Sequence, residues 1–119
     1  MATDDWPVEL RLSAGRRSLT LTDARGRASA LSAEYLRVES PSAEVRGHGP
    51  GQEVLVAGKA DVAIAALESV GNYAIRIVFD DGHDTGLYTF AFLAELARDH
   101  DRRWPRYLAA LAAAGLSRG

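Results

Sequence analysis

The apolar residues of this 119-residue chain change their spacing once, at Thr89. Before Thr89 they alternate with polar residues, most clearly over 73–79, which is typical of strands with one buried face. After Thr89 they recur three and four residues apart, as on one stripe of a helix. Because the strands precede the helices, the pattern predicts an α+β fold: a small antiparallel β-sheet domain with C-terminal helices.

Turn residues separate the predicted strands. The expected strands cover residues 8–12, 19–22, 62–66, 73–79 and 87–88. Ala14-Gly15, Gly71-Asn72 and Asp80-Asp81-Gly82 supply tight turns between them. Ile77 and Phe79 are expected to face the core of the clearest strand, and a short helical turn or loop is expected over Ser32–Arg37.

Two helices are expected after Thr89, which is a good N-cap residue. The first carries the apolar stripe and is expected to end where Pro105 interrupts it. The second is expected to run from Pro105, which suits a first helical position, to Gly115, which suits a C-cap. The stripe of the first helix consists of Leu93, Leu96, Ala97, His100 and Trp104.

Length and composition bound the class of protein. A chain of 119 residues predicts a single domain over 1–119, with a core over about 7–116 and a disordered segment over 1–5. The absence of cysteine excludes disulfides, thiolate zinc sites and cysteine nucleophiles, and it fits a cytoplasmic location. No apolar run approaches the roughly 18 residues of a membrane span. The net charge of −2 gives no general bias toward nucleic acid or membrane lipid.

The densest group of metal-ligand residue types is Asp80, Asp81, His83 and Asp84. Carboxylate oxygen and imidazole nitrogen can bind iron or zinc. Asp-Gly is also a standard turn pair, in which aspartate caps its own backbone, and we favour that turn. His83 is then expected to have a structural role, hydrogen-bonded near the loop from Ser40 to Ser42.

No known catalytic motif is complete. The histidines His48, His83 and His100 lack the His-x-Asp pair that is usual at a non-haem iron site. The glycine-rich loop 47–52 fits neither the Rossmann nor the Walker pattern. Ser40 or Ser42 with His83 and an aspartate resembles a hydrolase triad, but no nucleophile elbow is present. The arginines over 98–106 could clamp nucleic acid, but acidic residues among them favour ion pairs on a helix face.

Three segments together resemble one known family. They are the run Ser69-Val70-Gly71-Asn72-Tyr73-Ala74-Ile75-Arg76-Ile77-Val78-Phe79-Asp80-Asp81-Gly82-His83-Asp84-Thr85-Gly86-Leu87-Tyr88, the run Leu36–Glu44, and the ending Tyr107–Leu116. On these residues, from about Pro7 onward, the chain resembles the gamma-butyrobetaine hydroxylase-like N-terminal domain, including its short bacterial stand-alone members. The resemblance implies a domain of unknown function that is not itself catalytic.

The resemblance also implies a metal site that this chain has lost. In the two-domain hydroxylases the module precedes a catalytic iron and 2-oxoglutarate domain, and it binds structural zinc through a Cys-x-Cys-x-x-Cys cluster and a later histidine. The three thiol positions correspond to Ser40, Ser42 and Val45, and the histidine corresponds to His83. Serine is a poor zinc ligand and valine is none, so only His83 remains. Similar modules follow some P-loop ATPases with iron–sulfur clusters, which implies a role near metal-centre assembly.

Two hypotheses follow. The first is a non-catalytic binding or adaptor module for an unknown protein partner, with no cofactor expected. Its expected contact surface consists of Arg46, His48, Gln52, Asp81 and His83. The alternative is a metal-binding accessory protein linked to iron or iron–sulfur centre assembly, with zinc or iron at His83. Elemental analysis separates the two.

Overall fold

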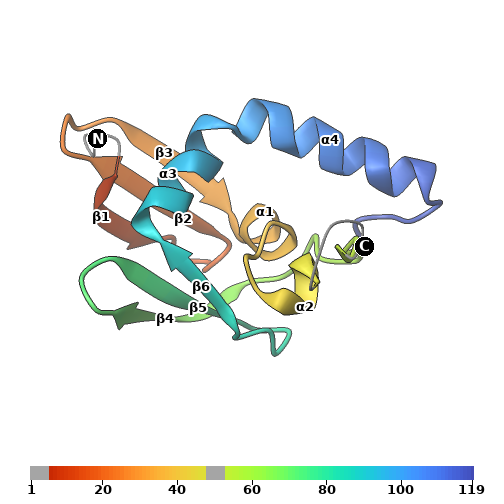
Figure 1. The fold of residues 1–119 in the computed structure, drawn as a ribbon, viewed down its shortest axis with the longest axis horizontal. Helices are drawn as coiled ribbons and strands as arrows, with labels where there is room; N and C mark the ends of the chain where they lie inside the picture. The colour runs from red at the N-terminus through yellow and green to blue at the C-terminus, as the bar shows by residue number, and fades with distance from the viewer. Residues whose placement is uncertain (1–5, 48–52) are drawn as a thin grey trace.

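A computed structural model describes residues 6–47 and 53–119 of the chain (Figure 1). Within these residues the strands form two three-stranded antiparallel sheets. The first sheet has the order β1 (Pro7–Leu12), β2 (Ser18–Asp23), β3 (Ala28–Ser32). The second has the order β4 (Ile64–Val70), β5 (Ala74–Phe79), β6 (Gly86–Thr89). The predicted α+β class, with helices at the C-terminal end, is confirmed.

Consecutive strands pair through short turns, as the alternation predicted. In the first sheet Leu21 of β2 lies opposite Leu10 of β1. In the second sheet Ile77 of β5 lies opposite Leu67 of β4. Ile77 and Phe79 are 0% and 1% exposed, so the predicted inward face of β5 is confirmed. Because side chains alternate along a strand, this register fixes which face of each sheet meets the core.

Two strand predictions need correction. Strand β3 was not expected, because Leu31 is the only large apolar residue in its five positions. Its antiparallel pairing with β2 makes it a strand. Strand β4 runs over Ile64–Val70 rather than over 62–66, and its register shifts between Ile64 and Ala66. Val62 is buried but precedes the strand.

Each of the first three helices begins at a hydroxyl-bearing cap. Helix α1 (Ala33–Val38) fulfils the short helical turn expected there, and the Ser32 side chain accepts from the Tyr35 N–H. Ser42 caps α2 (Ala43–Arg46), and Thr89 caps α3 (Phe90–Arg98) by accepting from the Phe92 N–H. Such caps satisfy backbone donors that have no partner inside the helix. Helix α4 (His100–Ala113) follows directly.

The predicted break at Pro105 is wrong. The chain breaks at Asp99, and Pro105 lies inside α4. Proline has no N–H, so the ring removes one helical hydrogen bond near the start of α4. The Asp99 carbonyl accepts from the N–H groups of Arg102 and Arg103, which completes the first turn before the proline. Burial of Tyr107 and Leu111 then holds the rest of the helix.

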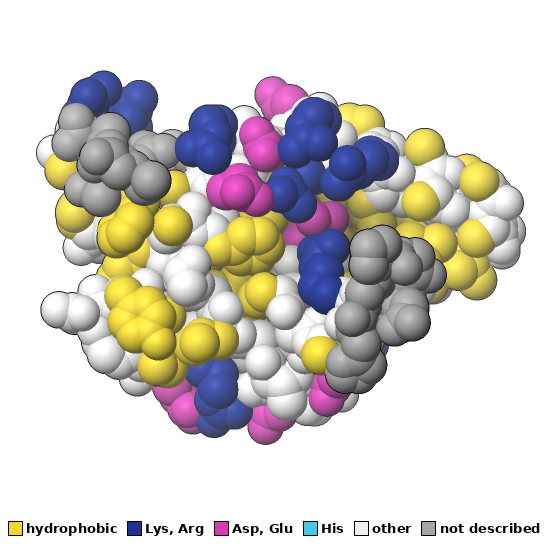
Figure 2. Space-filling model, viewed as in Figure 1, with side chains coloured by type: hydrophobic (Ala, Val, Ile, Leu, Met, Phe, Trp, Pro, Cys, Tyr) yellow, Lys and Arg dark blue, Asp and Glu magenta, His cyan; other side chains and the backbone are white. Residues whose placement is uncertain are grey.

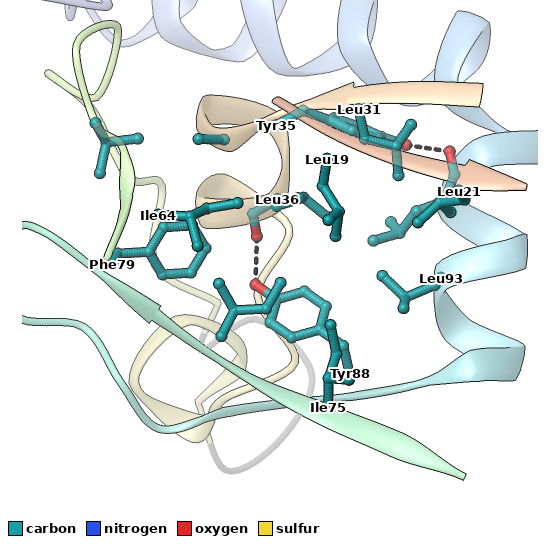
Figure 3. Packing of buried hydrophobic residues seen from close by; sticks show 14 residues of the cluster. Leu19, Leu21, Leu31, Tyr35, Leu36, Ile64, Ile75, Phe79, Tyr88 and Leu93 are labelled. Atoms are coloured by element: carbon teal, nitrogen blue, oxygen red, sulfur yellow. Dashed lines mark hydrogen bonds between the residues drawn. The ribbon is translucent and has the colours of Figure 1, made fainter. Parts of the chain in front are cut away.

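The core fills the space between the two sheets, α1 and α3 (Figure 3). Two buried tyrosines cross it: the Tyr35 hydroxyl donates to the Leu96 carbonyl, and the Tyr88 hydroxyl donates to the Leu36 carbonyl. Burial raises the pKa of both tyrosines. Each hydroxyl has a partner, so neither tyrosine carries the cost of an unpaired buried group. In the described ranges, no helix has the length and apolar character to span a bilayer.

Candidate functional site

His83 lies at the centre of a buried hydrogen-bonded group, here called the histidine cluster. The Ser40 Oγ lies 2.8 Å from His83 Nε2, and Glu44 Oε2 lies 2.9 Å from His83 Nδ1. Beside them, the Ser42 and Thr85 hydroxyl oxygens are 2.6 Å apart. These five residues define the cluster. The predicted hydrogen bond between His83 and the Ser40–Ser42 loop is therefore present.

The turn after β5 places the histidine. The His83 carbonyl accepts from the Phe79 N–H, and the Asp81 carboxylate accepts from the His83 N–H at 3.1 Å. Gly82 has a φ of 92°, which favours glycine. The predicted Asp-Gly turn is therefore formed. It directs His83 into the protein, where His83 is only 4% exposed.

Gly86 allows the two halves of the cluster to approach. A Cβ at this position would lie 2.8 Å from the Ser40 Oγ and 2.9 Å from the Tyr88 ring. Any side chain would therefore push the α1–α2 connection away from β6. The sequence predicted the strand here but gave no sign that a glycine was needed for this contact.

The hydrogen-bond partners occupy both nitrogens of the histidine ring. A carboxylate only accepts, so Glu44 places a proton on His83 Nδ1. His83 Nε2 shares a hydrogen bond with the Ser40 hydroxyl, and Ser40 Oγ also accepts from the Ser42 N–H at 3.2 Å. Both ring nitrogens and the Ser40 hydroxyl are fully used inside the cluster.

Ser40, His83 and Glu44 have the connectivity of a hydrolytic triad, with glutamate in place of the aspartate that the sequence suggested. The Ser40 residue is 0% exposed and its Oγ packs against Gly86. A nucleophile must reach a substrate carbonyl at near contact distance. A fully buried hydroxyl has no such access, so this arrangement is suited to holding the fold rather than to attacking a substrate.

The cluster does not fit zinc. A structural zinc ion takes four ligands, usually thiolates and imidazoles. At the corresponding positions Val45 offers no donor, and both nitrogens of His83 are occupied by Ser40 and Glu44. Over residues 6–47 and 53–119, no three histidine, cysteine or acidic residues gather as a metal site would require.

Asp81, another expected contact residue, is paired within the protein. Its Oδ2 lies 2.8 Å from Arg37 Nε and 2.7 Å from Lys59 Nζ. Burial alone would raise the pKa of Asp81, but hydrogen bonds from Lys59, the His83 N–H and Arg37 outweigh it and lower the pKa to about 2. The carboxylate therefore stays ionised and joins the turn to α1 and to the segment before β4.

The expected contact surface is only partly within the described residues. His48 and Gln52 lie outside them. His83 is buried, and Arg46 donates to the Ser40 carbonyl at 3.0 Å and lies 3.4 Å from Glu39. The surface thus contributes more to internal contacts than the sequence suggested.

A groove opens beside Arg46, here called the valine groove. It has a volume of about 200 Å³. Most of its lining is apolar. Two charged residues of the lining, Arg106 of α4 and Glu53, form no ion pair with any described residue and are here called the rim charges. Val54, also in its lining, is 53% exposed. The lining consists of Val38, Glu39, Val45, Arg46, Glu53, Val54, Leu55, Val56, Arg106, Tyr107 and Ala110.

Charged side chains form a second buried group, here called the ionic cluster, where α1, α3 and α4 meet. Arg103 donates to Glu39 at 2.7 Å and to Glu95 at 2.6 Å, and Asp99 lies 3.8 Å away. Figure 2 shows dark blue and magenta side chains gathered over α1 and the first turns of α4. The predicted ion pairs within the helical segment are present for Arg102 with Asp99 and for Arg103 with Glu95. The expected solvated face is wrong for Arg103, whose side chain is only 12% exposed. Glu39, 64 residues away in the chain, was not foreseen.

The comparisons with known proteins give the family of the chain and agree with its fold. The model of the family "gamma-butyrobetaine hydroxylase-like, N-terminal" matches residues 10–94. The chain belongs to the gamma-butyrobetaine hydroxylase-like N-terminal family. No curated protein matches the chain.

Solved structures share the fold over most of the chain. One protein solved by NMR in solution is 47% identical, with a TM-score of 0.81, and the match covers 94% of this chain and 88% of that one. A second NMR structure is 48% identical, with a TM-score of 0.79 and coverage of 99% and 89%. A crystal structure of a protein of unknown function from Acidithiobacillus ferrooxidans is 33% identical, with a TM-score of 0.66 and coverage of 82% and 98%.

Proposed function

We propose that this chain is a non-catalytic binding module that takes a partner protein segment in the valine groove. The observation that carries the proposal is a largely apolar groove whose rim charges, Arg106 and Glu53, have no ion pair to any residue within 6–47 and 53–119. An exposed apolar surface bounded by polar residues marks an interaction site more often than scattered apolar residues do. Family membership supports a module of this size, since the family model describes an N-terminal region and matches residues 10–94.

The rim charges define the partner. The side chain of Glu39 already pairs with Arg103 and Arg46, so it offers no charge to a ligand. Arg106 and Glu53 are the charges that remain for one. The matching partner presents an apolar side chain for the floor and an acidic residue for Arg106, because opposite charges at a rim favour encounter and orientation.

Capture from the native host tests the proposal when matched variants are compared. Val54→Asp places a charge on the groove, and Arg106→Glu reverses the rim. Val8→Asp is the control, because Val8 is 70% exposed on β1, away from the groove lining. We expect wild type and V8D to enrich the same protein, and V54D and R106E to lose it, at low salt and with quantification by mass spectrometry. Equal enrichment by all four proteins contradicts the groove as the contact site.

The alternative, a metal-binding accessory protein for iron or iron–sulfur centres, rests on the family resemblance and on His83. Protein purified without a histidine tag and measured by elemental analysis separates it from the first proposal. Stoichiometric iron or zinc that is lost in His83→Ala favours the accessory role. Substoichiometric metal that is unchanged in His83→Ala removes it.

A further inference from the structure

The segment after α4 folds back onto the protein in a defined way. Helix α4 ends in a Schellman motif, in which the Leu116 N–H donates to the Leu111 carbonyl and the Gly115 N–H to the Ala112 carbonyl. Gly115 has a φ of 70°, the left-handed conformation that this motif requires. The chain then reverses and returns from the far end of α4 toward α1 (Figure 1).

The returning segment, residues 117–119, is held through its backbone. The Gly58 N–H donates to the Ser117 carbonyl at 3.0 Å, and the Ala60 N–H donates to the Arg118 carbonyl at 2.9 Å. In peptide recognition, main-chain hydrogen bonds supply affinity and side-chain contacts supply specificity.

The side chain of Arg118 contacts Glu34 and Trp104. Its Nη2 lies 2.7 Å from Glu34 Oε1 and its Nε lies 3.0 Å from Glu34 Oε2, a bidentate pair. Its guanidinium carbon lies 5.5 Å from the centre of the Trp104 ring. Arginine forms both contacts better than lysine, because its planar group matches a carboxylate and stacks on an aromatic ring.

The two partners of this ion pair differ in burial. Glu34 is 5% exposed, whereas the Arg118 side chain is 51% exposed. The carboxylate is therefore a fixed part of the protein that requires a cation, and the arginine that supplies it lies at the surface. A site with a buried recognition group and an exposed ligand is one that the ligand can leave and re-enter.

We propose that Glu34, Trp104 and the backbone N–H groups of Gly58 and Ala60 form a recognition site for an arginine in a peptide segment, which Arg118 occupies in the free chain. The ligand is an arginine-bearing segment of another protein. The valine groove shares no residue with this site. The proposed arginine site can therefore be tested independently of the proposed partner in the groove.

Peptide binding to an emptied site tests the inference. In Arg118→Ala the peptide acetyl-Ser-Arg-Gly-amide is expected to shift the NMR signals of the Gly58 and Ala60 amides saturably, at concentrations on the order of those that a short tether supplies, about millimolar. Acetyl-Ser-Lys-Gly-amide is expected to bind several-fold more weakly. Adding Glu34→Gln to R118A is expected to abolish the shifts. Absent shifts with the arginine peptide, or equal shifts with the lysine peptide, overturn the inference.

A second measurement keeps the test decisive if R118A does not fold. In wild type the Arg118 Nε–H is expected to exchange with water more slowly than the Nε–H of Arg11, whose side chain is 75% exposed. Wild type is also expected to release Arg118 when the arginine peptide is present in excess, with the Arg118 Nε–H then exchanging as fast as that of Arg11. An Arg118 that already exchanges like Arg11 without peptide, or one that excess peptide leaves unchanged, overturns the inference.

Discussion

The histidine cluster and the ionic cluster each include one of two consecutive residues, Ser40 and Glu39. They nevertheless stabilise the protein through different kinds of contact. In the histidine cluster the buried groups are the Ser40 and Ser42 hydroxyls and the His83 imidazole, and the one carboxylate, Glu44, has a side chain that is 61% exposed. In the ionic cluster the paired Glu39 and Arg103 side chains are only 10% and 12% exposed. One joins the α1–α2 connection to β6, and the other joins α1 to α4.

The difference has a physical consequence. A neutral hydrogen bond inside a protein contributes about 1 kcal/mol net, so the histidine cluster spreads its stabilisation over several modest contacts and the burial of Val45. A buried ion pair carries a large desolvation cost, so losing one partner leaves an uncompensated charge. Removing one hydroxyl from the histidine cluster should therefore lower the free energy of unfolding only slightly, whereas introducing a charge beside it should lower it strongly. The ionic cluster should be sensitive to loss of either partner.

The largest loss of stability is expected when a charge is introduced next to the histidine cluster. Val45 is 3% exposed, and Val45→Asp replaces apolar burial with an unpaired carboxylate. We expect the free energy of unfolding to fall by about 3–5 kcal/mol, measured by chemical denaturation. Val54→Asp is the matched control, with the same chemistry at a half-exposed position, and should stay within about 0.5 kcal/mol. Equal losses in the two variants would show that the protein does not distinguish the two valines by burial.

A smaller loss is expected on the ionic side. Arg103→Ala removes the main partner of Glu39 but leaves Arg46 at 3.4 Å from it. We expect a loss of about 2–3 kcal/mol, below the usual range for an abandoned buried charge because Arg46 remains. Arg102→Ala is the control, since the Arg102 side chain is 59% exposed and its pair with Asp99 should contribute about 0–1 kcal/mol. A ratio near one between the two losses argues against a buried ionic cluster.

The third prediction concerns how stability depends on acidic pH through Asp81, which stabilises the turn that carries His83. Its pKa is lowered from 3.8 to about 2, so its contribution to stability is present above 3.8 and is lost as the pH falls toward 2. Asp81→Asn should be less stable than wild type at neutral pH, and the difference should shrink between pH 4 and pH 2. Denaturant midpoints across this range measure it.

Much of the histidine side could be read from the sequence because its signals are local. Asp81-Gly82 predicts the turn. The resemblance then placed His83 near Ser40. Helix α2, with its Ser42 cap, was not predicted, and Glu44 was missed because its histidine partner lies 39 residues away.

The partner residues in the ionic cluster and at the Arg118 site could not be predicted from the sequence. Their partners are separated by 64 and 84 residues, and no local pattern pairs a given glutamate with a given arginine over such distances. The helix boundary at Asp99 failed for a related reason. Pro105 is a strong local signal, but the tertiary contacts of Tyr107 and Leu111 outweigh the cost of one lost hydrogen bond.

The smallest expected effect is the response to metal removal, and it tests what replaced the thiolates. A zinc site in a small domain can supply a large share of the folding free energy, so a protein that still used one would unfold more easily in a chelator. Here Val45 is buried, and Ser40 and Ser42 each have hydrogen-bond partners across the cluster in His83 and Thr85. These contacts stand where metal bonds would be. We therefore expect the melting temperature to be unchanged in excess EDTA and unchanged again when zinc is added, while Val45→Asp lowers it clearly. A fall of several degrees in EDTA alone, reversed by zinc, would show that a metal binds this loop and that the hydrogen-bonded cluster is not the whole of what holds it.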